Sequence, residues 1–412
     1  MHNNSLTDAI LESALTAPAT IIKAPPGAGK SYLAALIAGL NALGANRSVV
    51  IATPTRAQGI DLAQNITTAY PAAHITWHAP EPAHGLNHTP KVKDLPPGPH
   101  IAVGTIAKWG YYTPENHDGA YDLLIVDEAW QVTDAALATI AHLAPRHVLI
   151  GDPGQVAPVV TADMSEWATL PDAPTRPAPE TMTYRHPSTP VFQLPATRRF
   201  GPDTANVVST HFYDFDWGTV AEPHTLVMPH HTGIDTHDVQ ITASTLQADH
   251  TVTRADPEMA AHLANLAQTI STEGHIQTPH GSHPVGTIYI AAAHVDQVAA
   301  ARAATAGMNV VVDTAERLQG RQTEVVLVWH PVSGQETATD FQRDTGRLCV
   351  MLSRHKAACI VAMREDTPDA LNDYASAGRT VSGTDTGYQS WATAREVTAT
   401  LTERTITRPA IR

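Results

Sequence analysis

Two cysteines, Cys349 and Cys359, are the only ones among the 412 residues. So few thiols argue against a fold held together by disulfides and are typical of a reducing compartment. The chain also has no run of about 18 uncharged apolar residues, which argues against a transmembrane helix. Its first six residues lack the basic region and apolar core of a secretory signal. We therefore expect a cytoplasmic protein without membrane contact.

Positive charge is also scarce. Lysine and arginine total 26 against 40 acidic residues, which gives a net charge of −14. Such acidity argues against a protein that holds nucleic acid by bulk charge alone. Most of the net negative charge lies in residues 201–300, which hold one basic residue, eleven acidic residues and eleven of the 23 histidines. We expect this acidic, His-rich segment to face away from any bound nucleic acid.

The remaining composition is that of a globular α/β protein. Apolar residues make up 43% of the chain, and 412 residues are enough for two domains. Short apolar runs alternate with helical patterns, which is typical of parallel sheets. The strand-like runs are Thr20–Ile22, Ser48–Ala52, His100–Val103, Leu123–Val126, His147–Ile150, Gly286–Ile290, Met308–Val312, Val325–Trp329 and Cys359–Met363. The helical patterns include Ser31–Ala42, Ala57–Tyr70, Asp134–Leu143, Pro257–Ile270 and His294–Ala306.

Proline-rich segments predict the domain organisation. Residues 71–99 carry seven prolines, and Pro171–Pro195 is rich in proline and threonine. We predict a first domain over residues 1–195 with a short Pro/His-rich insertion at 71–99. A second domain over residues 196–370 then contains the acidic segment 201–300. Residues 371–412 are expected to form a weakly structured C-terminal tail.

A phosphate-binding loop follows the first apolar strand. After Lys23 the chain reads Ala24-Pro25-Pro26-Gly27-Ala28-Gly29-Lys30-Ser31 and continues into an apolar helix. Backbone N–H groups of such a turn and helix N-terminus bind anions. Lys30 is positioned to reach the β- and γ-phosphates, and the Ser31 hydroxyl to hold Mg²⁺. Ala24 stands where the first glycine is usual, and a small residue suffices there.

Two further strand ends carry polar residues. Asp127 and Glu128 come directly after the Leu123–Val126 strand, which in a nucleotide-binding sheet ends beside the phosphates. Asp127 can hold Mg²⁺, directly or through water, and Glu128 can polarise the attacking water. A tight turn after the His147–Ile150 strand positions Gln155 to sense the γ-phosphate.

These three sites together resemble the superfamily 1 helicases, whose later motifs follow here in order over nearly the whole chain. Thr53–Arg56 resembles motif Ia, Leu194–Phe200 motif IV, Thr314–Arg321 motif V and Arg347–Lys356 motif VI. His211–Tyr213 and Val285–Gln297 are similar to stretches of the branch that includes the nonsense-mediated-decay helicases.

The resemblance implies two tandem RecA-like domains with parallel sheets, with ATP and Mg²⁺ bound in the cleft between them. It also implies that Arg199 and Arg354 of the second domain stabilise charge on the γ-phosphate. Phosphoryl transfer depends mostly on positioning and charge stabilisation, so such an arginine can contribute about 10³–10⁵ in rate. Domain closure would then drive movement along single-stranded DNA or RNA, and the branch implies 5′-to-3′ movement.

Three departures from the family pattern concern the base and the ribose. The stretch Leu6–Leu15 lacks the glutamine that often reads adenine. Arg198 replaces an aromatic residue that stacks on the base, although a guanidinium plane can stack too. Gln322, close to Gly320, replaces a glutamate that usually meets the ribose. We expect Arg198, Gly320 and Gln322 to contact the nucleotide, and we expect a relaxed nucleotide preference with hydrolysis retained.

Contacts with a nucleic-acid strand are expected from hydroxyls, amides and a few basic groups, which grip a backbone without reading its sequence. The candidates for these contacts are Thr55, Arg56, Thr105, Lys108 and Thr314. Trp109 and Tyr111 could offer stacking faces or could simply pack against their neighbours, and the sequence leaves both interpretations open.

The function that these motifs favour is a monomeric nucleic-acid-dependent NTPase motor, either a helicase or a translocase that moves without unwinding. The alternative is an NTP-dependent switch or assembly module. A loading partner protein is compatible with both. Turnover that rises with single-stranded nucleic acid favours the motor, and turnover that does not change favours the switch.

Overall fold

The computed structural model describes residues 2–91, 95, 98–113, 120–158, 165–167, 170–234, 239–249, 254–335, 338–372 and 386–406. The chain forms two compact units. The first unit contains Met1–Pro153 and Ala157–Leu194, and the second contains Gly154–Val156 and Pro195–Arg412. No helix among the described residues is long and apolar enough to cross a membrane.

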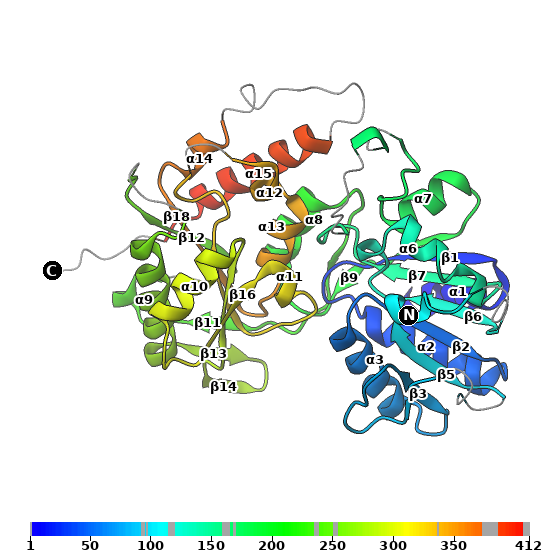
Figure 1. Cartoon of the computed structure of the whole chain (residues 1–412). Helices are drawn as coiled ribbons and strands as arrows, with labels where there is room; N and C mark the ends of the chain where they lie inside the picture. The colour runs from blue at the N-terminus through cyan, green and yellow to red at the C-terminus, as the bar shows by residue number, and fades with distance from the viewer. Residues whose placement is uncertain are drawn as a thin grey trace. The chain divides into compact units, whose positions relative to one another are not determined.

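The first unit is built on a parallel sheet of eight strands (Figure 1) in the order β4-β3-β5-β2-β6-β7-β1-β8. Its central strands are apolar on both faces, as a sheet covered by helices on both sides requires. The strands are β1 (Ala19–Lys23), β2 (Val49–Thr53), β3 (Ile75–His78), β4 (His88–Thr89), β5 (Ile101–Thr105), β6 (Leu123–Val126), β7 (His147–Gly151) and β8 (Val191–Gln193).

Two hydrophobic clusters cover the two faces of this sheet. On one face the strands pack with α1 (His2–Thr16), α2 (Lys30–Gly39), the π-turn η1 (Leu40–Gly44) and α3 (Arg56–Ala69). On the other face they pack with α4 (Ile106–Trp109), η3 (Ala129–Gln131), α6 (Asp134–Ala138), η4 (Ala141–Leu143) and α7 (Ala178–Arg185). The short 3₁₀ turn η5 (Ser165–Trp167) completes the unit.

The expectation of an insertion over residues 71–99 is wrong where the structure describes strands. β3 pairs in parallel with β5, and β4 pairs in parallel with β3, so both strands extend the sheet. All of β3 is buried, and Ile75 and Trp77 pack with Leu62 and Ile66 of α3. The surrounding prolines and histidines concealed an ordinary buried strand. Residues 92–94 and 96–97 of the segment lie outside the described residues.

The second unit contains a smaller parallel sheet in the order β12-β18-β17-β15-β16. Its strands are β12 (Ile241–Leu246), β15 (Ile288–Ala292), β16 (Val310–Thr314), β17 (Val325–Trp329) and β18 (Ala358–Arg364). Beside it lie a parallel pair, β9 (Ala196–Thr197) with β10 (Gly218–Thr219), and an antiparallel set, β11 (Thr225–Val227), β13 (His275–Thr278) and β14 (Gly281–Pro284). Two parallel α/β sheets agree with the expected tandem RecA-like domains.

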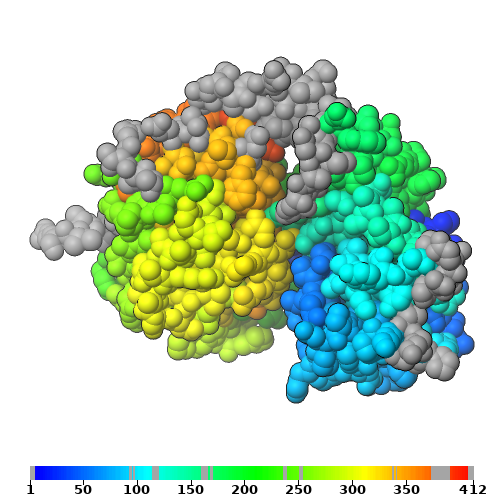
Figure 2. All heavy atoms as spheres, in the orientation of Figure 1, coloured from blue at the N-terminus to red at the C-terminus, as the bar shows by residue number. Residues whose placement is uncertain are grey.

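Helices again cover both faces of the sheet. One face packs with α9 (Pro257–Glu273) and α10 (Val295–Ala304). The other packs with α8 (Pro202–Phe212), α11 (Ala315–Leu318), α13 (Thr345–Leu352) and α15 (Thr386–Glu403). The remaining elements are η6 (His230–Thr232), α12 (Asp340–Arg343) and α14 (Thr367–Ala370). The acidic segment 201–300 runs from α8 to α10, and its yellow-green residues appear along the left and lower margins of this unit in Figure 2.

The expectation of a weakly structured tail after residue 370 is wrong for residues 386–406. Most of this segment is helix α15, in which Val397 and Leu401 are fully buried against the sheet. Arg404 anchors the end of the segment through an ion pair of 2.8 Å with Asp203 of α8. The apolar residues recur at helical spacing, but many threonines separate them, so the pattern is weak in the sequence.

Candidate nucleotide and strand sites

The phosphate-binding loop connects β1 to the N-terminus of α2, as the sequence predicts. Gly27 and Gly29 have φ angles of 76° and 95°, in the left-handed region that favours glycine. Ala24 is fully buried, and its N–H donates to the carbonyl of Gly151 at 2.9 Å. Because this position has ordinary strand-like bonding, alanine replaces the usual glycine without cost. The loop therefore keeps the backbone shape that presents N–H groups to an anion.

Lys30, which follows the loop after β1, contacts carboxylates that follow β6 and β7 in the first unit. Its Nζ atom lies 3.7 Å from Oε1 of Glu128 and 3.6 Å from Oδ2 of Asp152. The Lys30 and Glu128 side chains are each only 11% exposed, and the Asp152 side chain is buried. The sequence motifs did not predict a role for Asp152, although it lies in the same turn as Gln155. It balances the charge of Lys30 and orients its ammonium group.

Glu128 sits on a strained backbone turn. Its φ and ψ angles are 52° and 43°, and Asn46 is the only other non-glycine residue with positive φ in the described chain. A non-glycine residue in this region costs about 1–2 kcal/mol. The turn packs tightly on the end of β7, where a Cβ atom at Gly151 would lie 2.8 Å from the backbone N of Ala129. Strain and close packing together hold the two consecutive carboxylates at the end of β6.

Asp127 has the properties of a cation ligand. It is 5% exposed, and its Oδ1 atom has no hydrogen-bond partner among the residues that the structure describes. Burial raises the pKa of this carboxyl, as does the neighbouring charge of Glu128, while Lys30 and the N–H of Glu128 oppose the shift. Carboxylate and hydroxyl oxygens are the donors that Mg²⁺ prefers. Asp127 and Ser31 therefore fit the group that the loop chemistry implies.

Gln155 belongs to the second unit rather than the first. The chain passes from the first unit to the second at Gly154 and returns at Ala157. The Oε1 atom of Gln155 accepts a hydrogen bond of 2.8 Å from Nε2 of Gln319, and Val156 packs in the core of the second unit. Asp152 and Gln155 lie in the same turn, but Asp152 belongs to the first unit and Gln155 to the second.

Three of the motifs predicted in the second unit converge on Arg199. Its Nε atom donates to Oε1 of Gln322 at 3.0 Å, and Nη1 donates to the carbonyl of Ser353 at 2.6 Å. The hydroxyl of Ser353 accepts from Nη2 of Arg354 at 2.8 Å. Gln322, the departure from the family glutamate, therefore serves as a neutral acceptor that orients Arg199. Gly320 has a φ angle of 80°, and Arg198 is exposed beside Arg199.

Arg354 is fully buried, and its Nε atom donates to the carbonyl of Val350 at 3.0 Å. The adjacent His355 was not singled out from the sequence. It stacks on Phe200 with ring centroids 5.7 Å apart and bonds to the Thr204 hydroxyl at 2.8 Å. Burial, together with the charges of the two neighbouring arginines, lowers the pKa of His355 to about 3. A neutral His355 therefore joins motifs IV and VI without adding positive charge.

Four candidates for strand contacts lie together at the carboxyl edge of β2 and β5. These strands are neighbours, and Thr53 pairs in register with Thr105. The hydroxyls of Thr55 and Thr105 cap α3 and α4. Arg56 is an exposed partner of Glu81 at 3.2 Å, and the Nζ atom of Lys108 donates to the carbonyl of Pro90 at 3.0 Å. The fifth candidate, Thr314, ends β16 and is the N-cap residue of α11 in the second unit.

The two aromatic residues next to this edge have different environments. Trp109 is fully buried and donates from Nε1 to the carbonyl of Ile51 at 3.0 Å. Of the two interpretations left open above, ordinary core packing is therefore the right one for Trp109. Tyr111 is 81% exposed, so its ring is accessible to a partner.

Comparison with known proteins gives matches for both units. One protein-family model described as an AAA domain matches residues 7–169, and a second with the same description matches residues 181–366. No curated protein sequence matches the chain significantly.

Several solved structures resemble the chain. Arterivirus nonstructural protein 10 (helicase), in complex with DNA, shares 16% identity with a TM-score of 0.47, over 86% of this chain and 63% of that one. The PRRSV helicase shares 14% identity with a TM-score of 0.44, over 91% and 56% of the two chains. Escherichia coli DEAH/RHA helicase HrpB shares 13% with a TM-score of 0.49, over 87% and 42%. The chain thus spans less than two thirds of the length of each.

Proposed function

Since the chain belongs to the superfamily 1 helicase-like NTP hydrolases, as its two AAA domains show, we propose that it is a motor that moves along single-stranded nucleic acid. The observation that carries this proposal is the position of Lys30 between Glu128 and Asp152, directly after the phosphate-binding loop. A lysine balanced by two carboxylates at the ends of parallel strands is suited to bind and hydrolyse a nucleoside triphosphate.

In this proposal each residue of the first unit has a separate task. The backbone of residues 24–29 binds the β-phosphate, and Lys30 neutralises the charge of the β- and γ-phosphates. A Mg²⁺ ion held by Ser31 and Asp127 supplies further neutralisation of the phosphate charge when bound. Glu128 orients the attacking water and accepts its proton.

The second unit supplies cationic groups to the γ-phosphate in the same proposal. Arg199, which is oriented by Gln322 and by the Ser353 carbonyl, places a guanidinium group at the γ-phosphate. Arg354 adds a second guanidinium group, and the neutral amide of Gln155 senses the γ-phosphate. Arg198, Gly320 and Gln322 contact the base and ribose, and with a neutral amide at the ribose we propose that ATP is accepted together with other nucleoside triphosphates.

The proposed strand site of the first unit is the carboxyl edge of β2 and β5, and Thr314 is the proposed strand contact of the second unit. Hydroxyls and helix N-termini dominate this edge, so it suits the sugar–phosphate backbone of either DNA or RNA. This explains how a chain with a net charge of −14 could still bind nucleic acid, because the contacts are local rather than due to bulk charge. We propose movement in the 5′-to-3′ direction.

The test is NTP turnover measured without nucleic acid, with single-stranded DNA and with single-stranded RNA. We expect stimulation by at least one strand, and comparable turnover with ATP, GTP and CTP. Lys30→Ala and Glu128→Gln should each lower turnover by about 10²–10⁴ because they remove charge stabilisation and the proton acceptor.

The control for this test is Glu81→Gln, since Glu81 is an exposed partner of Arg56 and lies away from the phosphate loop. This variant should retain unstimulated turnover. Unchanged turnover in Lys30→Ala would contradict the site, and turnover that no strand stimulates would favour a nucleotide-dependent switch instead.

A further inference from the structure

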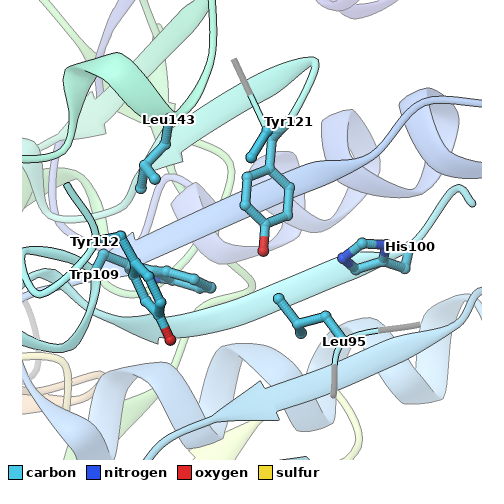
Figure 3. A pocket seen from close by; sticks show the side chains of 7 residues that line it. Leu95, His100, Trp109, Tyr112, Tyr121 and Leu143 are labelled. Atoms are coloured by element: carbon cyan, nitrogen blue, oxygen red, sulfur yellow. The ribbon is translucent and has the colours of Figure 1, made fainter. Parts of the chain in front are cut away.

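A small cavity lies inside the first unit, on the sheet face opposite α2 and α3. Its volume is about 160 Å³, and its walls are formed mainly by Leu95, His100, Trp109, Tyr112, Tyr121 and Leu143 (Figure 3). Trp109, Tyr121 and Leu143 belong to the hydrophobic cluster of that face, whereas the residues of α2 pack in the cluster of the other face. The cavity is therefore distinct from the phosphate-binding loop.

The aromatic wall of this cavity is held in place from behind. The indole N–H of Trp109 donates a hydrogen bond to the carbonyl of Ile51. The Trp109 ring stacks on His78 with ring centroids 4.7 Å apart. His78 donates from Nδ1 to the carbonyl of Thr89 at 2.7 Å and accepts at Nε2 from the Tyr112 hydroxyl. Both rings are therefore fixed by bonds made outside the cavity, and a ligand would meet a preformed surface.

Two polar atoms on the other side of the cavity are left without partners. The Tyr121 hydroxyl and the Nε2 atom of His100 are buried, and neither has a hydrogen-bond partner among the residues that the structure describes. Tyr121 and His100 are only 6% and 7% exposed. Figure 3 shows the Tyr121 hydroxyl pointing into the space between His100 and Trp109. Buried polar atoms are normally paired, so this pair indicates a missing partner.

The hydrogen-bonding character of these two atoms follows from their surroundings. His100 Nδ1 lies 2.8 Å from the carbonyl of Gly98, so Nδ1 carries the proton and Nε2 is an acceptor. Burial lowers the pKa of His100 and raises that of Tyr121, so both groups are neutral at physiological pH. The Tyr121 hydroxyl can donate while His100 accepts, and none of the described residues that line the cavity carries a charge.

We propose that this cavity binds one neutral heteroaromatic ring of pyrimidine size, with a ring N–H donating to His100 and an adjacent carbonyl accepting from Tyr121. The size agrees, because a cavity of about 150 Å³ in another protein holds a single benzene ring. The faces of the ring meet Trp109, Tyr112 and Leu143, and only one edge is polar. A uracil ring has this combination of apolar faces and a donor next to an acceptor.

The ring can belong to a free nucleoside or to a nucleotide within a nucleic-acid strand. The strand as source rests on the proposed function. The first experiment is calorimetric titration of the full chain with uridine and with N3-methyluridine, in which a methyl group replaces the donating hydrogen. We expect saturable binding of uridine and at least about tenfold weaker binding of the methylated ring, since one buried hydrogen bond is lost and its acceptor is left unpaired.

Tyr121→Phe tests the second hydrogen bond and keeps the ring that lines the cavity. It should weaken uridine binding about tenfold without lowering thermal stability, because the hydroxyl has no hydrogen-bond partner in the described part of the chain. The matched control is Tyr111→Phe, which removes a hydroxyl from an exposed ring outside the cavity and should leave uridine binding unchanged. His100→Phe provides a second variant, expected to weaken binding to a similar extent.

Parallel titrations with an oligouridylate distinguish the two sources. Equal weakening of uridine and oligouridylate by Tyr121→Phe assigns the ring to a strand, and weakening of uridine alone assigns it to a free nucleoside. Unstimulated NTP turnover should not change in this variant, so a failure here is separable from a failure of the proposed function. Absence of uridine binding, equal binding of N3-methyluridine, or unchanged binding in Tyr121→Phe would each overturn the proposal.

Discussion

Arg199 illustrates how single residues acquire a role through distant partners. Its guanidinium is held by the side chain of Gln322 and the carbonyl of Ser353, which follow it by more than a hundred residues in the sequence. A planar group fixed by two bonds loses little further entropy when it meets a phosphate. The sequence motif predicted an arginine at this position, whereas the orientation of its guanidinium depends on the fold of the second unit.

Replacement of Arg199 tests this role. Arg199→Ala should lower the strand-stimulated kcat by about 10³ and change KM only a few-fold, because the arginine acts on charge that develops in the transition state. Arg199→Lys should recover little of the loss, since an ammonium group cannot make both bonds and still reach a phosphate. Steady-state turnover against ATP concentration measures both constants.

The control for this measurement is Arg176→Ala, which removes a partly exposed arginine of the first unit that contacts Glu180 and the Leu170 carbonyl. It should behave as the unmodified chain does. A raised KM with unchanged kcat in Arg199→Ala would instead mean that the residue binds the nucleotide equally in the ground and transition states.

At the scale of elements, the functional groups stand at the carboxyl ends of parallel strands. β1, β7 and β6 end at the phosphate loop, Asp152 and Asp127, and their neighbours β2 and β5 end at the candidate strand contacts. Such ends are where open α/β sheets bind ligands, because loops diverge there and helix N-termini point toward the edge. One sheet edge therefore holds both the candidate nucleotide-binding residues and the candidate strand contacts of the first unit.

The junction of β7 with the turn after β6 gives a prediction at this scale. Gly151→Ala should destabilise the first unit by about 1–3 kcal/mol, because a Cβ atom there would lie 2.8 Å from the backbone N of Ala129 and from the ring of Trp130. It should also lower turnover, since the same turn holds Asp127 and Glu128.

Urea unfolding followed by circular dichroism measures the change. Gly44→Ala is the control, because a Cβ atom at Gly44 meets nothing within 4 Å and its φ angle is ordinary. Equal stability of the two variants would show that β7 and the turn can separate at no cost.

At the scale of the whole molecule, buried histidines make stability depend on pH. Burial lowers the pKa of His330 in the second unit to about 4 and that of His78 in the first unit to about 4, from an ordinary value of 6.5. Between these values the unfolded chain binds protons that the folded chain does not. Stability must therefore fall as pH decreases through this window, by up to about 1.4 kcal/mol per pH unit for each histidine.

Chemical unfolding at several pH values between 7.5 and 5 checks this expectation. His330→Gln should reduce the slope, because the variant keeps a polar side chain of similar reach to the Thr398 hydroxyl but cannot titrate. A slope that is the same with and without His330 would mean that the pKa of His330 does not differ between the folded and the unfolded chain.

Much of this protein could be predicted from the sequence because the determining physics is local. Runs such as Val325–Trp329 must be buried strands, and their observed bounds agree with the apolar pattern. The shape of the phosphate loop follows from its glycines and the adjacent helix, and the order of the motifs indicated the family. The sequence did not predict α15 and β3, because threonines, histidines and prolines interrupt the apolar pattern of both segments.

Only the tertiary structure could decide which polar residues meet. It places Asp152 beside Lys30, joins Arg199 to Gln322 and Ser353, buries Trp109 in the core, and leaves Tyr121 and His100 facing a cavity. Each of these results depends on pairing between segments far apart in the chain, which no local pattern encodes. The sequence alone determined the sheet type, the nucleotide-binding loop and the family. The tertiary structure decided the orientation, the burial and the charge balance of the polar side chains, because these depend on neighbours that only folding brings together.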